Sequence, residues 1–355
     1  MLIRLHRNIH WIDNLVPTTW HVRRRTRIDT LTDFSAGEIA GLCYWVPPNT
    51  LDEINSVSQR YRDVIVYVCE PWGTMVGDTN FLDTFFAADW PNVTMYADIL
   101  FDQTRPNYKQ INNWFMEWDQ LYHNCTWAPD LIKACYHPEL SSKPYRFDAL
   151  LGRRRPNKQF VYDQWQQSSF KQHILLTYYD KDVDQGIWDY DYTKTETGFD
   201  DGITMQWTHM PAGGNHKYLV YTPNLLPVSI YKSSWYSIIA EGFINPCGTR
   251  LTEKTAKALI SGRLFVYFGA VNDLRRLRSL GFQTFDGIIN ENYDNIFDNE
   301  LRWQMAWQQV EYLCTQDPVE IQQASKDIRE HNQRVFLTTD WFAPLRQHVK
   351  DLFDK

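Results

Sequence analysis

The chain has 355 residues, of which 43% are hydrophobic and 22% are charged, and its formal net charge at pH 7 is −7. This composition is typical of a folded globular protein and excludes an intrinsically disordered one. The acidic balance argues against broad nucleic-acid binding, which needs a basic surface.

The length predicts two domains. No run of about 18 apolar residues could span a bilayer, and the first residues lack the apolar stretch of a signal peptide. The six cysteines show neither CxxC pairs nor a structural zinc spacing. We therefore expect a cytoplasmic protein without a membrane span, with reduced cysteines.

The first half of the chain alternates apolar, β-branched runs with amphipathic segments. The expected strands are 39–46, 63–73 and 92–100, and the expected helices are 50–63, 81–90 and 108–122. Thr50 and Glu53 have the spacing of a capping box at the start of the first helix. Such alternation predicts a doubly wound, mainly parallel sheet.

An irregular, Pro-containing segment at 128–143 precedes a second alternating region. This region has expected strands at 145–153, 173–179, 217–223, 236–241, 265–269 and 282–285, and expected helices at 159–170, 252–260 and 271–281. A polar insertion at 180–214 interrupts it, and the chain after Asp298 is expected to be helical. The fold class is therefore α/β, with two Rossmann-like doubly wound domains, a central cleft and a helical C-terminus. The domain boundaries are placed at 1–140, 141–330 and 331–355.

The most informative stretch runs from Tyr236 to Gly269 and reads as strand, polar loop, helix and strand. Glu241 ends the first strand, and Thr252-Glu253-Lys254 begins the helix. If Thr252 caps this helix, the remaining N–H groups and the helix dipole form an anion site suited to a diphosphate. A cation such as Lys254 opposes the dipole there, so it is mildly costly without a nearby anion. The alternative is an ordinary capped amphipathic helix.

This stretch resembles the donor-binding motif of α-1,3-fucosyltransferases and related GT-B glycosyltransferases. The shared pattern is a strand ending in Glu, a Leu-Thr-Glu-Lys turn, a helix, a Ser-Gly turn and an apolar strand ending in Gly. The longer sequence around this stretch is also similar to a group of glycosyltransferase-like proteins common in phage genomes. The specific match covers roughly residues 145–300. The resemblance implies a GT-B-like fold, with an acceptor-side domain at 1–140 and a nucleotide-sugar donor-binding domain at 141–330.

The resemblance also implies roles for individual residues. Glu241 and Glu253 would contact hydroxyls of the donor's ribose or sugar, and Lys254 would contact the diphosphate. Arg250 and Thr252 belong to the same expected donor-binding set.

A second phosphate grip is expected on the loop 152–158, where the family has an arginine. The family's Ser-Ala-Arg pattern is absent, so Arg153, Arg154, Arg155 and Lys158 all remain candidates. We favour Arg155 and Lys158, because a planar guanidinium suits paired phosphate oxygens. A solvated basic turn is the alternative.

An inverting transfer needs a general base that takes the proton of the acceptor hydroxyl. The family supplies a carboxylate from its N-terminal domain. Glu70 follows the apolar part of the expected strand 63–73 and is the first candidate for this base. Asp78, in the following loop, is the second candidate. Glu70 could instead cap the next helix.

Two acidic triplets, Asp182-Val-Asp184 and Asp189-Tyr-Asp191, could hold Mn²⁺ or Mg²⁺ on donor phosphates. His209 and His216 flank a Gly-Gly turn nearby. The two-domain pattern favours the metal-independent class, so we expect a UDP- or GDP-sugar donor and no obligatory metal.

The sequence thus predicts a glycosyltransferase, hexosyl- or fucosyltransferase-like, with a glycan or small-molecule acceptor. One alternative is a phage-type DNA glycosyltransferase acting on hydroxymethylated pyrimidines in the host cytoplasm, which would need a basic cleft near Arg23–Arg27. Another is a non-catalytic protein that binds nucleotide sugars. The oligomeric state stays open.

Overall fold

The computed structural model divides the chain into two compact units, each with its own five-stranded sheet. The first unit comprises residues 1–117, 247–250 and 340–355, and the second comprises 118–246 and 251–339. The residues that the structure describes are 2–5, 39–44, 51–68, 80–97, 100–101, 107–112, 115, 129, 132–133, 135, 142–153, 155–180, 185–188, 226–242, 244, 248–344, 347–348 and 351.

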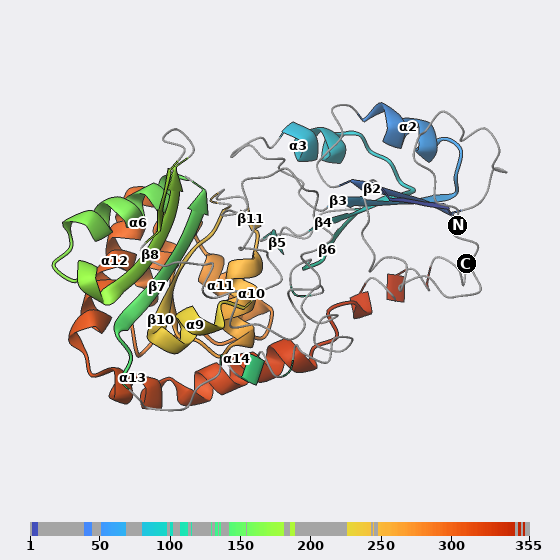
Figure 1. Ribbon diagram of the computed structural model, residues 1–355. Coiled ribbons are helices and arrows are strands. Elements are labelled where there is room, and N and C mark those ends of the chain that lie inside the picture. Colours follow the sequence, from blue (N-terminus) through green and yellow to red (C-terminus); the bar gives the residue numbers. More distant parts are fainter. Residues whose placement is uncertain are drawn as a thin grey trace. The chain divides into compact units, whose positions relative to one another are not determined.

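The sheet of the first unit has the order β1-β2-β3-β4-β6, and all its pairs are parallel. Its elements are β1 (Leu2–Leu5), β2 (Ile39–Tyr44), α2 (Asp52–Ser58), β3 (Asp63–Val68), α3 (Asn80–Ala87), β4 (Val93–Ala97) and β6 (Tyr108–Gln110). Helices α2 and α3 lie on the same face of this sheet (Figure 1). Right-handed crossovers that all advance in one direction place their helices on one face. A doubly wound sheet requires a reversal of the strand order. The described strands of this sheet show no such reversal.

The C-terminal segment belongs to the first unit because its side chains pack there. Trp341 makes an edge contact with Phe115 at 4.9 Å between ring centroids, and His348 hydrogen-bonds the hydroxyl of Tyr96. A short antiparallel pair, β5 (Leu100–Phe101) with β11 (Gly248–Thr249), completes this unit. The division therefore differs from the predicted boundaries after residues 140 and 330.

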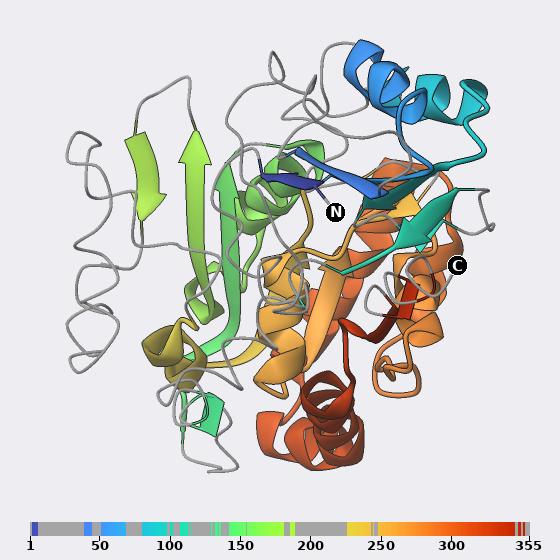
Figure 2. The ribbon, with the colours of Figure 1, turned by 90° about the vertical axis from the view of Figure 1, so that its right-hand side faces the viewer.

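The sheet of the second unit has the order β12-β10-β7-β8-β9 and is parallel except for β9. Its strands are β7 (Tyr145–Arg153), β8 (Ile174–Asp180), β9 (Gln185–Trp188), β10 (Ser234–Ala240) and β12 (Phe265–Phe268). Its helices are α6 (Pro156–Gln167), η2 (Lys171–His173), α9 (Val228–Ser233), α10 (Glu253–Ile260), α11 (Asp273–Ser279), η4 (Glu291–Asn295), α12 (Asn299–Thr315), α13 (Pro318–Ala324) and α14 (Lys326–Thr338). Figure 2 shows β9, β8 and β7, yellow-green to green, side by side.

Helices cover both faces of this second sheet. In Figure 1, α6 and α12 lie on one face, and α10 and α14 lie on the other. All seven residues of β10 are buried, as expected for a central strand of a parallel sheet that is covered on both sides. The second sheet is thus doubly wound, as predicted.

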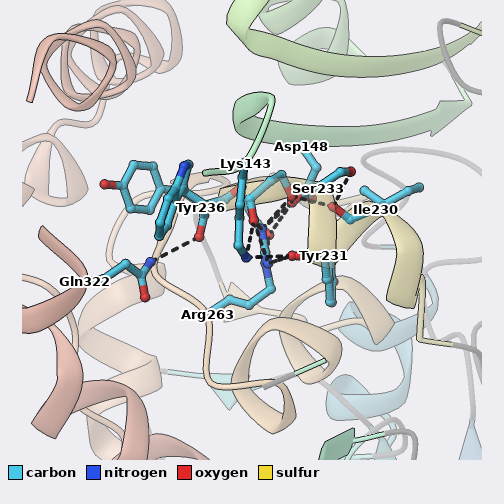
Figure 3. Close-up of polar contacts among 11 residues, drawn as sticks. Lys143, Asp148, Ile230, Tyr231, Ser233, Tyr236, Arg263 and Gln322 are labelled. Carbon is cyan, nitrogen blue, oxygen red and sulfur yellow. Dashed lines mark hydrogen bonds and ion pairs between the residues drawn. The ribbon is translucent and has the colours of Figure 1, made fainter. Parts of the chain in front are cut away.

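A buried polar network ties the amino-terminal ends of β7, β10 and β12 together (Figure 3). Arg263 forms an ion pair with Asp148 at 2.6 Å, donates to the Ser237 hydroxyl at 2.7 Å, and lies over the Tyr231 ring at 4.1 Å. Lys143 donates to the carbonyl oxygen of Tyr231 at 3.0 Å. Because all three guanidinium nitrogens of Arg263 donate to acceptors within the fold, this network is structural.

Several local predictions can be compared with the structure. The strand 145–153 and the helical stop at Gly281, whose φ is 92°, are confirmed. The helix expected at 108–122 is wrong at its start, because residues 108–110 pair with β4 as strand β6. The described residues 282–285 form no strand, and α2 is capped by Leu51 without a side-chain hydrogen bond.

Candidate anion site

The second sheet contains a topological switch point between β7 and β10. The chain runs from β7 to β8 on one side, and later returns to β10 on the other side of β7. Helices α6 and α10, which follow β7 and β10, therefore begin at the same edge of the sheet. Ligands of open α/β sheets bind outside the carboxyl ends of the strands at such a point. The first turns of α6 and α10 define the candidate site.

The first turn of α6 has no side-chain cap. Arg155 is the N-cap residue, with φ −148° and ψ 158°, and Pro156 occupies the first helical position. Proline is favoured there because its fixed φ suits a helix start and its missing N–H needs no partner. The N–H groups at the start of a helix have no intrahelical acceptor, so this turn can donate to an anion.

Lys158 lies in this turn and is only 5% exposed. Its Nζ makes no hydrogen bond or ion pair to any residue in the described part of the chain. Burial, and then the neighbouring ammonium of Lys254, lower the pKa of Lys158 to about 7, although Glu253 and Glu241 act in the opposite direction. Burying an ammonium without a partner is costly, so a bound anion would relieve this cost.

The first turn of α10 is organised by a buried carboxylate. Thr252 is the N-cap, and its hydroxyl accepts from the backbone N–H of Lys254 at 3.4 Å, which confirms the predicted cap. The Glu241 carboxylate accepts from the backbone N–H of Thr252 at 3.0 Å and from the hydroxyls of Thr252 and Thr255 at 2.5 Å each. Glu241 is fully buried. Its oxygens are therefore occupied by the protein's own donors, and it positions the turn.

Glu253 and Lys254 are mostly buried in this turn, with side chains 12% and 14% exposed. They form a direct ion pair. Burial opposes ionisation of Glu253, but the ammonium groups of Lys254 and Lys257 outweigh it and lower its pKa to about 2. Glu253 is therefore a carboxylate at neutral pH and can accept hydrogen bonds from hydroxyl groups.

Asn157 connects the two helix starts and was not predicted from the sequence. Its Nδ2 donates to the backbone oxygens of Glu241 at 2.8 Å and of Phe268 at 2.6 Å. These bonds join the start of α6 to the ends of β10 and β12. Its Oδ1 is buried and accepts no hydrogen bond from the described residues. The only sequence signal was a polar residue in a Pro-Asn-Lys helix start, which is too common to single it out.

The neighbouring loop, between β12 and α11, is closed by the protein itself. The Asp294 carboxylate accepts from the backbone N–H groups of Leu274 at 2.9 Å and Arg275 at 3.0 Å, at the start of α11. A Cβ on Gly269 would lie 2.1 Å from the Asp273 carboxylate, so only glycine fits. Because an internal carboxylate already accepts hydrogen bonds at this helix start, the start of α6, which has no side-chain cap, is the better place for an external anion.

The structure brings six of the predicted site residues together at the switch point. These are Arg155, Lys158, Glu241, Thr252, Glu253 and Lys254. Arg250 is half-buried and follows β11 in the first unit. Glu70, Asp78, Asp182, Asp184, Asp189, Asp191, His209 and His216 lie outside the described residues.

Comparisons with protein families, with curated proteins and with solved structures gave no match to this chain. In the portion of the chain with a described structure, no helix has both the length and the apolar character needed to cross a membrane. No group of three or more His, Cys, Asp or Glu residues suited to a metal ion occurs among the described residues.

Thr252→Val is expected to lower the free energy of unfolding by about 1–3 kcal/mol, because it removes the cap and leaves the buried Glu241 carboxylate short of a donor. Thr252→Ser keeps both hydrogen bonds and should cost much less. Urea denaturation of the two variants measures the difference. Equal losses in both variants would contradict the role assigned to the hydroxyl.

Proposed function

We propose that this chain is a glycosyltransferase that binds the diphosphate of a nucleotide sugar between the first turns of α6 and α10. One observation carries the proposal: the Lys158 side chain is only 5% exposed, makes no ion pair with a described residue, and feels the charges of Lys254 and Glu253 at the start of α10.

The charges around this point suit an anion with two phosphate groups. Three cations lie around this point, those of Arg155, Lys158 and Lys254. Two carboxylates lie there as well, those of Glu253 and Glu241, and the Glu241 carboxylate is fully buried. The positive ends of two helix dipoles add to the cations. The uncapped start of α6 can donate backbone N–H groups, and the cations on both turns add to them, which matches a diphosphate better than a single carboxylate.

The resemblance to fucosyltransferases supports a sugar nucleotide over other diphosphates. In the proposed complex, Lys158 and Lys254 contact the phosphate oxygens, and Arg155 approaches them from the α6 N-cap. Glu253 accepts hydrogen bonds from ribose or sugar hydroxyls. Glu241 holds the Thr252 turn and does not touch the donor, which modifies the role that the resemblance implies.

The remaining parts of the proposal come from the resemblance. It implies a GT-B arrangement in which the first unit serves the acceptor, and an inverting, metal-independent transfer to a glycan or small molecule in the cytoplasm. Glu70 is proposed as the general base and Asp78 as the second candidate. Arg250 remains a proposed donor contact.

A panel of UDP-, GDP-, CMP- and ADP-linked sugars tests the proposal by thermal shift. At a concentration about 100 times its Kd, a bound donor should stabilise the protein by about 2.7 kcal/mol. The donor that binds should then be hydrolysed or transferred, and Glu70→Gln should abolish this turnover without abolishing the thermal shift. The absence of a shift with every donor would contradict the proposed function, and binding without turnover would favour a non-catalytic binding protein.

A further inference from the structure

A side chain continues the hydrogen bonding of β10 and β12 beyond the two strands. The backbone N–H of Glu241, the residue after β10, donates to the carbonyl oxygen of Phe268 at 3.2 Å. Asn157 Nδ2 donates to that same oxygen at 2.6 Å and to the carbonyl oxygen of Glu241 at 2.8 Å. Asn157 belongs to the first turn of α6, so these contacts fix this turn to the carboxyl ends of both strands.

The carboxylate of Glu241 extends this connection to α10. It accepts from the backbone N–H of Thr252 and from the hydroxyls of Thr252 and Thr255, at the start of that helix. Four residues thus form a buried relay between the two helix starts, and none of them is more than 6% exposed: Asn157, Glu241, Thr252 and Thr255. Hydrogen bonds are stronger away from water, so the relay holds the two helix starts firmly together.

Only the donor half of the Asn157 amide contributes to the relay. Its Oδ1 is buried and accepts no hydrogen bond from the described residues. A buried acceptor without a donor destabilises a fold. Asn157 therefore makes its two donor contacts at the expense of stability, a feature that native proteins show at functional sites.

We propose that Asn157 is a positioning residue for the donor diphosphate, and that it acts through the relay by setting the separation of the α6 and α10 turns. This inference rests on the proposed function, because it assumes that the diphosphate contacts groups on both turns. Such a ligand binds tightly only when the two turns are already held at the right distance. A change in that distance lowers the affinity although every contacting group is still present.

Asn157→Leu removes both donor contacts of the amide and keeps a side chain of comparable size. Inorganic pyrophosphate is the probe, and calorimetry is carried out at a temperature at which the variant is folded. We expect the affinity for pyrophosphate to fall by about tenfold or more, because small misplacements of binding groups have effects of this size.

Ser234→Ala is the matched control for a general loss of stability. It removes a fully buried hydroxyl that donates to Asp148 at 2.8 Å, at the opposite end of β10. This variant should be less stable in urea and should keep the wild-type affinity for pyrophosphate. Equal losses of affinity in Asn157→Leu and Ser234→Ala, or wild-type affinity in Asn157→Leu, would overturn the inference and leave the proposed function standing.

A second pair of variants tests the other end of the relay and does not depend on the folding of Asn157→Leu. Thr255→Val removes one donor to Glu241 and should lower the affinity for pyrophosphate, whereas Thr255→Ser keeps the hydroxyl and should retain that affinity. Equal affinities in these two variants would likewise overturn the inference. A failure of pyrophosphate to bind the wild type at all would contradict the anion site and the inference together.

Discussion

Lys158→Met is expected to remove donor binding and, at the same time, to raise the melting temperature of the ligand-free protein. A buried ammonium without a bonded partner destabilises the fold, and a hydrophobic residue of similar volume does not. Replacing buried charges in this way is neutral or stabilising by about 1–4 kcal/mol. Loss of the main buried cation should lower the affinity for a nucleotide sugar below detection in the thermal-shift panel.

The pH dependence of this stabilisation has a defined sign. The pKa of Lys158 is about 7 in the fold, against an ordinary value of 10.5, so the unfolded chain binds the proton more tightly. The cost is therefore fully present below pH 7 and decreases as the pH rises toward 10.5. The advantage of Lys158→Met should be largest near pH 6 and should nearly vanish near pH 10. Lys143 also has a pKa lowered to about 7, chiefly by burial, so only the difference between variant and wild type identifies Lys158.

Lys326→Met is the matched control for the loss of one lysine. Lys326 is 60% exposed and forms only a 3.9 Å surface pair with Glu330, which contributes little to stability. Donor binding and the melting temperature should both stay near their wild-type values in this variant. A Lys158→Met protein that still binds the donor, or that is destabilised at pH 6, would contradict the role assigned to Lys158.

Arg263→Met is expected to produce the largest loss of stability in the second unit. It removes the ion pair with Asp148 and the bond to Ser237, and it leaves the Asp148 carboxylate buried without its ion-pair partner. Breaking a buried pair by removing one partner costs about 3–5 kcal/mol. The free energy of unfolding from urea denaturation measures this loss. Since the network lies at the edge of the sheet opposite the candidate site, any folded fraction should keep its donor affinity.

Arg334→Met provides the control, because Arg334 is exposed on α14 and its guanidinium lies 3.5 Å from His331 Nδ1. Surface substitutions of this kind usually change stability by less than about 0.5 kcal/mol. Similar losses in Arg263→Met and Arg334→Met would show that the buried network is not the source of the effect.

Local signals in the sequence predicted the parts of the site that depend on neighbouring residues. The apolar run 145–153 became β7, and Thr252 caps α10 because the cap needs only the next turn of the chain. Asn157 could not be predicted in this way, since its two acceptors lie 84 and 111 residues further along the chain.

Contacts between residues far apart in the sequence also explain the predictions that differ from the structure. Residues 108–110 have helical periodicity in the sequence, but pairing with β4 makes them a strand. Trp341 and His348 return to the first unit through contacts with Phe115 and Tyr96, far away in sequence. The resemblance implies a contact between Glu241 and the nucleotide sugar. In the structure, three hydrogen bonds from the protein's own groups occupy the Glu241 carboxylate instead.

A crystal structure of the protein with the nucleotide sugar selected by the thermal-shift panel shows where the diphosphate binds. We expect diphosphate oxygens within hydrogen-bonding distance of Lys158 Nζ and of the backbone N–H groups in the first turns of α6 and α10. A diphosphate bound at any other place, with Lys158 still buried and without an anionic partner, would contradict the proposed site.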